Sequence, residues 1–171
     1  MGAVLLGLLV LLAVADPATD SASSPLLGRP APAVVSQTLD GRPFDLARRK
    51  GSWVVLNFFN STCVPCRNEH PNLLAFDTAQ EKADDPVELY TVVNDDSDAA
   101  VEAFFGANGG DWPRVRDDDG AIAVAFGVAK VPETWVVDPN GFVRLRVVGE
   151  VTAGFLEQRV AAMRAADAGQ S

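Results

Sequence analysis

The sequence predicts an α/β fold in which a mixed central β-sheet carries helices on both faces and an N-terminal β-hairpin extension. The runs "WVVLNFF" (Trp53–Phe59) and "PVELYTVVN" (Pro86–Asn94) have the apolar content of strands that are buried on both faces. A helical pattern separates them, so they form a right-handed parallel crossover. The later segment "ETWVVDPNGFVRLRVVG" (Glu133–Gly149) contains two strand patterns around a Pro-Asn-Gly turn, which adds an antiparallel hairpin.

Shorter patterns predict the remaining elements. Val34–Leu46 alternates apolar and polar residues around an Asp-Gly turn, which predicts the N-terminal hairpin. The spacing of apolar residues and caps predicts helices from the cysteine motif to about Ala83, from about Ser97 to the Gly109-Gly110 pair, within Gly120–Val128, and after Thr152.

Composition limits the class of protein. The chain has 171 residues, of which 48% are apolar and 22% charged, as expected for one globular domain with a terminal extension. The net charge of −9 argues against a nucleic-acid partner, because proteins that bind phosphate backbones need a basic surface. The acidic clusters lack the alternating oxygen ligands of a calcium loop, so we expect them to serve in turns and helix caps.

The N-terminus differs from the rest of the chain. Gly2–Ala15 is a run of small and apolar residues, shorter than a membrane span of about 20 residues but suited to the apolar part of a signal peptide. Residues 13–15 (Ala-Val-Ala) offer a cleavage site, although no basic residue precedes the run. We expect residues 1–15 to be a signal peptide or truncated membrane anchor, 16–27 a flexible linker, and 28–168 a folded domain outside the cytoplasm.

Both cysteines and the only histidine lie in "FNSTCVPCRNEHP" (Phe59–Pro71). A purely structural Cys63–Cys66 disulfide would close a very short loop and stabilise the fold little. Structural zinc takes four protein ligands and catalytic zinc three, whereas this motif offers two thiols and His70; a two-thiolate copper(I) site stays open. Redox chemistry is favoured, because the pair lies at a strand-to-helix junction within a strand–helix–strand pattern.

The position of the motif assigns a role to each cysteine. Cys63 falls at the start of the helix, where free N–H groups and the helix dipole favour an anion. Such settings lower a cysteine pKa from about 8.5 to between about 3.5 and 7.5. We expect Cys63 to attack a partner disulfide and Cys66, further into the helix, to resolve the mixed disulfide. Pro65 suits the first helical turn, and Pro71 should kink the helix.

These residues resemble the thioredoxin-like thiol–disulfide oxidoreductases of the TlpA/ResA/CcmG (DsbE) group. The resemblance rests on the motifs "GRPAP", "TLDGRPFDL", "VVLNFFNSTCVPCRNEHP", "FGVAKVPETWVVDPNG" and "VVGEV" and covers residues 26 to 151. It implies a thioredoxin-like fold and a cis bond between Val131 and Pro132, with Pro132 facing Cys63. It also implies that Val131, Pro132 and Glu133 border an extended substrate segment, which pairs with the backbone of Val131.

The resemblance places Glu69 and Glu133 beside the dithiol. Glu69 is one helical turn after Cys66, where a carboxylate can act as general base for the resolving thiol. Ordinary exposed glutamates are the alternative for both positions. One departure is Thr62, which stands where the group usually has a tryptophan next to the first cysteine. His70 receives no role.

The sequence therefore predicts an exported or membrane-tethered, monomeric thiol–disulfide oxidoreductase that works as a reductase, with the Cys63–Cys66 disulfide as its only redox group. The resemblance implies as substrates the C-x-x-C-H disulfides of apocytochrome c or the cysteines of copper sites, and as partner a membrane thiol donor that reduces the protein again. The alternatives are a disulfide-forming oxidase and a copper-binding or metallochaperone domain that uses the two cysteines. A peroxidase of the peroxiredoxin type fits less well, because Thr62 directly precedes Cys63.

Overall fold

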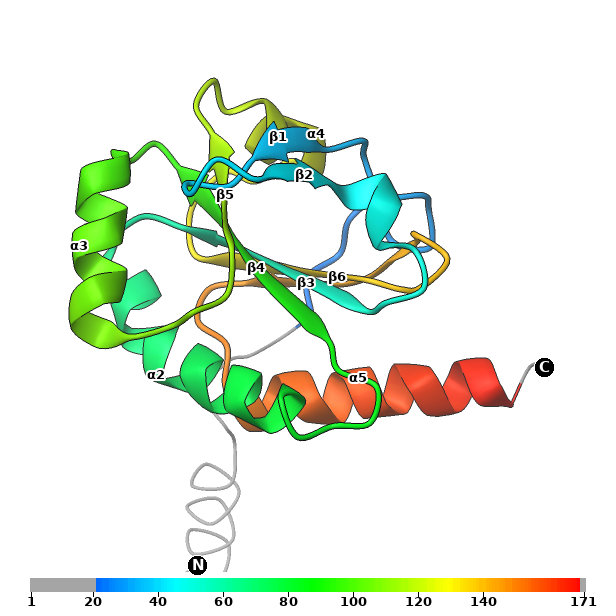
Figure 1. The fold of residues 1–171 in the computed structure, drawn as a ribbon. Helices are drawn as coiled ribbons and strands as arrows, with labels where there is room; N and C mark the ends of the chain where they lie inside the picture. The colour runs from blue at the N-terminus through cyan, green and yellow to red at the C-terminus, as the bar shows by residue number, and fades with distance from the viewer. Residues whose placement is uncertain (1–20, 170–171) are drawn as a thin grey trace, which may run out of the picture.

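The computed structural model describes residues 21–169. Its elements, in chain order (Figure 1), are β1 (Val35–Gln37), β2 (Pro43–Asp45), η1 (Leu46–Arg49), β3 (Val54–Phe59), α2 (Val64–Gln80), β4 (Glu88–Asn94), α3 (Asp98–Asn108), β5 (Arg114–Asp117), α4 (Ala121–Phe126), β6 (Glu133–Val137), β7 (Val143–Val148) and α5 (Ala153–Ala168). The order confirms the predicted α/β class and the N-terminal hairpin, in which β1 and β2 pair antiparallel.

The central sheet is mixed and has the strand order β5-β4-β3-β6-β7. β4 pairs in parallel with both β3 and β5, whereas β6 is antiparallel to β3 and β7 is antiparallel to β6. All six residues of β3 are buried, as the apolar run predicted for a strand covered on both faces. This central strand leads directly into the cysteine motif at the start of α2.

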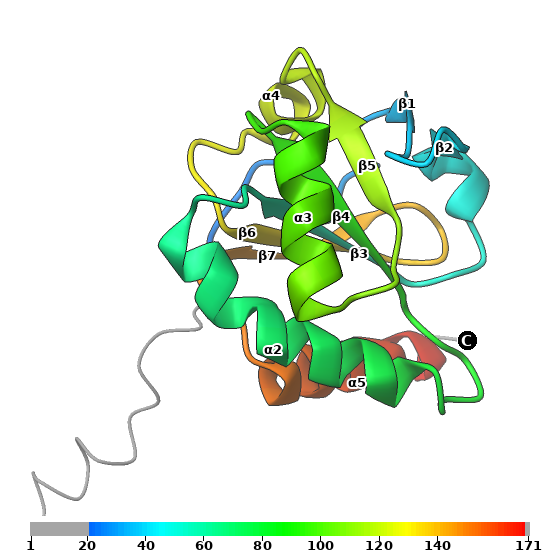
Figure 2. The same cartoon turned by 60° about the vertical axis from the view of Figure 1, so that its left-hand side comes forward.

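Helices cover both faces of the sheet (Figure 1 and Figure 2). One apolar cluster joins side chains of α2, α3 and α5 to the sheet, among them Phe76, Phe105 and Leu156. The other cluster joins α4, the hairpin and η1 to the opposite face, among them Phe126 and Phe44. The parallel steps from β3 to β4 and from β4 to β5 run in one direction across the sheet, so their right-handed crossovers place α2 and α3 on the same face.

The helix ends follow the predicted caps. At the start of α3, the hydroxyl of Ser97 accepts a hydrogen bond from the backbone N–H of Ala100. At the start of α5, the hydroxyl of Thr152 accepts one from the backbone N–H of Phe155. Gly127 adopts a left-handed conformation (φ 71°) that closes α4. The buried carboxylate of Asp117 accepts from the first-turn amides of α4 at 2.8 and 2.9 Å, so one member of the acidic clusters serves as a cap.

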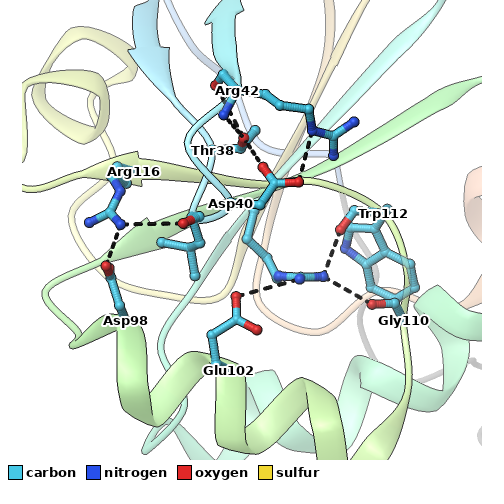
Figure 3. Close-up of polar contacts among 10 residues, drawn as sticks. Thr38, Asp40, Arg42, Asp98, Glu102, Gly110, Trp112 and Arg116 are labelled. Atoms are coloured by element: carbon cyan, nitrogen blue, oxygen red, sulfur yellow. Dashed lines mark hydrogen bonds and ion pairs between the residues drawn. The ribbon is translucent and has the colours of Figure 1, made fainter.

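β5 was not among the predicted strands, and the N-terminal hairpin covers its outer edge. Leu39 donates its backbone N–H to the carbonyl of Arg114 at 2.8 Å, and Thr38 forms an isolated bridge with Val115. Figure 3 shows the side chains that surround this contact, including the pair between Arg116 and Asp98 of α3. The hairpin thereby covers an edge strand that would otherwise expose backbone groups.

Residues 21–31 cover the opposite edge of the sheet. Ala22 donates its N–H to the carbonyl of Arg146, and Gly28 donates to the carbonyl of Val143, both at 2.8 Å. This segment includes residues 21–27 of the expected linker, whereas residues 1–15 and 16–20 lie outside the described residues. Within residues 21–169, no helix has the length and apolar character needed to cross a bilayer.

Candidate functional site

The two cysteines form a disulfide at the N-terminus of α2. Cys63 is the N-cap residue, and its Sγ accepts a hydrogen bond from the backbone N–H of Cys66 at 3.2 Å. Cys63 is partly exposed, whereas Cys66 is fully buried. An incoming partner can therefore reach Cys63, and the free amides of the first helical turn favour negative charge on its sulfur.

The loop before Cys63 is fixed by polar contacts to the segment after β4. The side-chain nitrogen of Asn60 donates to the carbonyl oxygens of Asn94 and Asp95 at 3.1 and 2.7 Å. The oxygen of the same amide accepts from the backbone N–H of Thr62 at 2.8 Å and from its hydroxyl at 2.6 Å. Thr62, which replaces the usual tryptophan, thus holds the loop by hydrogen bonds and leaves no large ring over the disulfide.

The loop before β6 lies beside the disulfide. The Val131–Pro132 bond is cis, as the resemblance implies. The Sγ of Cys63 lies 3.6 Å from the carbonyl oxygen of Val131. Gly149 donates its N–H to the carbonyl of Pro132 at 2.9 Å, which attaches this loop to the end of β7. The structure thus brings Val131 together with the exposed cysteine.

Glu133 follows this proline and is buried in an ion pair. Arg146 of β7 donates from Nε and Nη2 to its two oxygens at 2.9 and 3.1 Å. The indole N–H of Trp135 donates to Oε1 at 2.8 Å. The side chain is only 1% exposed, so Glu133 is not the ordinary exposed acid that the alternative assumed. Its oxygens are directed to Arg146 and Trp135, and these contacts hold the start of β6 against β7.

Glu69 is fully buried one turn after Cys66. Its Oε1 accepts from the side-chain nitrogen of Asn57 at 2.8 Å, and its Oε2 accepts from the backbone N–H of Val151 at 2.9 Å. Burial raises the pKa of Glu69 to about 7, against the smaller opposing effect of these two hydrogen bonds. A carboxyl with this pKa can both take up and release a proton near neutral pH.

Asn57 and Val151 are contacts of Glu69 that the sequence reasoning did not identify. The signal for Asn57 was its place in the otherwise apolar run "VVLNFF", where a buried amide needs a polar partner. Val151 contributes only a backbone amide from the segment between β7 and α5, and no side-chain pattern reports such a contact.

His70 contacts the C-terminal end of α3 and a group of aromatic side chains. Its Nε2 lies 2.9 Å from the carbonyl oxygen of Gly109, and its ring packs against Phe104, Phe105 and Trp112. Burial lowers the pKa of His70 below its usual value, so the ring is neutral at neutral pH. This is a helix-packing histidine.

The two prolines lie where the sequence reasoning expected them. Pro65 is in the first turn of α2 and Pro71 is inside the helix. Pro71 lacks the N–H that would bond one turn back, so it interrupts the hydrogen-bond ladder next to the buried Glu69–His70 pair.

Metal ligands are not gathered at the site. Among residues 21–169, no three His, Cys, Asp or Glu side chains are placed to share a metal ion. What the arrangement offers instead is an accessible sulfur, a buried partner sulfur and a buried carboxyl that titrates near neutral pH.

Known proteins share these features of sequence and fold. The family model described as Redoxin matches residues 26–163. The thiol:disulfide interchange protein HelX of Rhodobacter capsulatus is 34% identical over 138 residues, which are 79% of this chain and 75% of HelX. The thiol-disulfide oxidoreductase ResA of Bacillus thuringiensis (strain Al Hakam) is 32% identical over 132 residues, which are 77% of this chain and 75% of ResA.

Solved structures agree with the sequence matches. The structure of MTB DsbF in its mixed oxidized and reduced forms has a TM-score of 0.69 and 28% identity, and the match covers 75% of this chain and 93% of that one. StoA from Bacillus subtilis has a TM-score of 0.65 and 25% identity, with 80% and 99% of the two chains covered. The fold is thus thioredoxin-like.

Proposed function

The chain belongs to the redoxin family and is a thiol–disulfide oxidoreductase, and we propose that it is a reductase of protein disulfides outside the cytoplasm. One observation carries the proposal: the Cys63 sulfur is accessible at the N-terminus of α2 beside the carbonyl of Val131, while the Cys66 sulfur is buried behind it. This asymmetry suits a dithiol in which one sulfur meets the partner and the other completes the exchange.

The first step is attack by Cys63. In the reduced protein its thiolate attacks one sulfur of a substrate disulfide, so that a Cys63–substrate bond forms, the substrate disulfide breaks and the second substrate sulfur leaves as a thiolate. The N-terminus of α2 and the N–H of Cys66 stabilise the attacking thiolate. An extended substrate segment pairs with the backbone of Val131; the short distance of 3.6 Å between the Cys63 sulfur and the Val131 carbonyl oxygen supports this role.

Cys66 completes the reaction. The ionised Glu69 takes the proton of the Cys66 thiol, the Cys66 thiolate attacks Cys63, and the intramolecular disulfide forms while the substrate leaves as its second thiolate. Glu69 then returns its proton to solvent or to a substrate thiolate. Two electrons pass from the dithiol to the substrate disulfide, and a thiol donor at the membrane must supply two electrons to the protein for the next cycle.

The proposed substrate class is the one that the resemblance to the TlpA/ResA/CcmG (DsbE) group implies. We propose C-x-x-C-H disulfides of apocytochrome c or the cysteine pairs of copper sites, because a small CxxC-sized disulfide can approach a sulfur that Thr62 leaves uncovered. Export is supported by the apolar run and cleavage pattern in residues 1–15.

Replacement of Cys66 by alanine is expected to trap the substrate. The variant can form the Cys63–substrate disulfide but cannot resolve it, so a covalent complex should accumulate in the cell envelope and disappear on addition of a reductant. Non-reducing electrophoresis and mass spectrometry of the captured cysteine measure this, with Cys63→Ala as the matched control that captures nothing.

Two results would count against the proposal. Equal capture of substrate by Cys66→Ala and Cys63→Ala would contradict the roles of Cys63 as the attacking cysteine and Cys66 as the resolving cysteine. If the native protein in its oxidised form transfers its disulfide to the captured proteins, while the reduced protein leaves their disulfides intact, the direction is oxidation and the protein is a disulfide-forming oxidase.

A further inference from the structure

The hydrogen bonds around Glu69 leave one buried polar atom without a partner. Asn57 lies in the fully buried strand β3, and its side-chain nitrogen donates to Glu69 Oε1 at 2.8 Å and to Thr134 Oγ1 at 3.1 Å. Its side-chain oxygen is equally buried and accepts no hydrogen bond from the described residues. A buried acceptor without a donor is unfavourable, so this arrangement needs a reason.

The arrangement suits an ionised Glu69. Each carboxylate oxygen then accepts one hydrogen bond, Oε1 from Asn57 and Oε2 from the backbone N–H of Val151. A neutral Glu69 carries a proton that needs an acceptor. Because the N–H of Val151 can only donate, that proton belongs on Oε1, where it would meet the donating nitrogen of Asn57.

A half-turn of the Asn57 amide removes this conflict. The side-chain oxygen, which now lacks a donor, would then accept the Glu69 hydroxyl. The Thr134 hydroxyl currently accepts from Asn57, and a hydroxyl can donate as well as accept. It can therefore reverse and donate to the same Asn57 oxygen. Each orientation of Asn57 thus matches one protonation state of Glu69.

We propose that Asn57 is a positioning residue for proton transfer at Glu69, whose amide presents its nitrogen to the carboxylate and its oxygen to the neutral acid, with Thr134 reversing its hydroxyl in step. The inference rests on the proposed function, because it concerns the proton that Glu69 takes from Cys66. The turn itself moves no electrons and breaks only hydrogen bonds. The proton passes from the Cys66 thiol to Glu69 Oε1 and leaves when the substrate thiolate or water accepts it.

Among the described residues, the charged and titratable groups on the elements around Glu69 do not replace Asn57 as the hydrogen-bond partner of its carboxyl. On β6, Glu133 is paired with Arg146. In the segment after β7, Glu150 adds a negative charge that raises the pKa of Glu69 further. On α2 itself, the cysteines are joined as a disulfide and the His70 ring packs against aromatic side chains. α5 contributes the apolar Leu156 and Val160 to the core on this face, and its Glu157 and Arg159 are exposed.

NMR of the full-length, oxidised protein tests the turn of the amide directly. The Glu69 carboxyl is followed by its 13C resonance from pH 5 to 9 and assigned by its absence in Glu69→Gln. As Glu69 takes up its proton, we expect the proton–proton contacts between the Asn57 NH2 group and the Thr134 side chain to weaken. The pH midpoint of this change should equal the midpoint of the Glu69 titration. In Glu69→Gln, the new amide mimics the neutral acid, so these contacts should be weak at every pH. Contacts that persist unchanged while Glu69 titrates would overturn the proposal.

The variant Asn57→Leu tests the energetic coupling. It removes both the donor to the carboxylate and the acceptor for the neutral acid. Because the charge-assisted bond to the carboxylate is the stronger of the two, we expect the midpoint of Glu69 to rise by about one pH unit. The matched control is Thr91→Val, which removes a different buried polar group, the β4 hydroxyl that accepts from the indole N–H of Trp112. A merely structural Asn57 would lower stability like Thr91 and leave the midpoint in place, which overturns the proposal.

These readouts keep the inference separate from the proposed function. If Asn57→Leu does not fold, the measurements on the native protein and on Glu69→Gln still decide the turn of the amide. Capture of substrates by Cys66→Ala depends on neither, so the reductase proposal can fail while the Asn57 proposal stands, and the reverse.

Discussion

Replacement of Arg146 by methionine is expected to lower the free energy of unfolding by about 3–5 kcal/mol, the usual cost of leaving a buried charge without its partner. Arg146 supplies two of the three hydrogen bonds to Glu133, whose side chain is 1% exposed. Without Arg146, the carboxylate keeps only the indole N–H of Trp135. Methionine retains most of the apolar length of arginine, so the loss measures the charge more than the packing.

Urea unfolding of the oxidised protein measures this effect. The matched control is Arg42→Met, because Arg42 pairs with Asp40 where both side chains are more than half exposed, at 66% and 52%. An exposed pair contributes about 0–1 kcal/mol, so Arg42→Met should change stability little. The double variant Glu133→Gln/Arg146→Met should recover most of the loss, since no charge stays buried. Equal effects of the two arginine variants would contradict the importance of burial.

The ion pair between Glu133 and Arg146 also shows which part of the environment of Glu133 could be predicted from the sequence. The resemblance to the TlpA/ResA/CcmG (DsbE) group suggested a role beside the dithiol, because Glu133 follows Pro132 in the matching motif. Its partner Arg146 lies across the β6–β7 hairpin, and the register there shifts at Val136/Val137. A shift by one residue changes which side chains share a face, so the contact depends on a detail that turn residues alone do not give.

The strands likewise divide into those that the sequence pattern predicts and those that depend on their neighbours in space. β3 was predicted because a strand buried on both faces is apolar at nearly every position, here at all but Asn57, which leaves a clear signal. β5 was not predicted, since "RVRD" contains only one apolar residue, Val115, and four residues are too few for a period. Its neighbours in space, β4 and the N-terminal hairpin, make it a strand.

Residues 21–27, the described part of the expected linker, illustrate a limit of composition. A segment rich in Ser, Ala and Pro is typical of a linker, because it cannot bury an apolar face. Here it lies along β7 through backbone hydrogen bonds, such as that from Ala22 to Arg146. Backbone donors and acceptors are the same in every sequence, so such pairing leaves little trace in residue type. The redox chemistry of the cysteines, by contrast, could be predicted because it depends on two side chains at a fixed spacing at a strand-to-helix junction, and the resemblance to the TlpA/ResA/CcmG (DsbE) group added Glu69.

Replacement of Glu69 by glutamine is expected to remove a pH dependence of stability worth about 3 kcal/mol. The pKa of Glu69 is about 7 in the folded protein and 4.5 is its ordinary value. Between these values the folded state binds more protons than the unfolded state, so the free energy of unfolding of the native protein falls as pH rises from 4.5 to 7. Glutamine cannot ionise, and this part of the fall should vanish.

The measurement is the stability difference between Glu69→Gln and the native protein at pH 5 and at pH 8, by urea unfolding with the disulfide intact so that the thiols do not titrate. All other acids titrate in both proteins and cancel in this difference. Glutamine should therefore be more favourable, relative to glutamate, at pH 8 than at pH 5. The control Glu157→Gln, at an exposed position of α5, should show no such trend. A difference that is the same at both pH values would mean that Glu69 stays ionised across this range, and it could then not carry the proton of Cys66 near neutral pH.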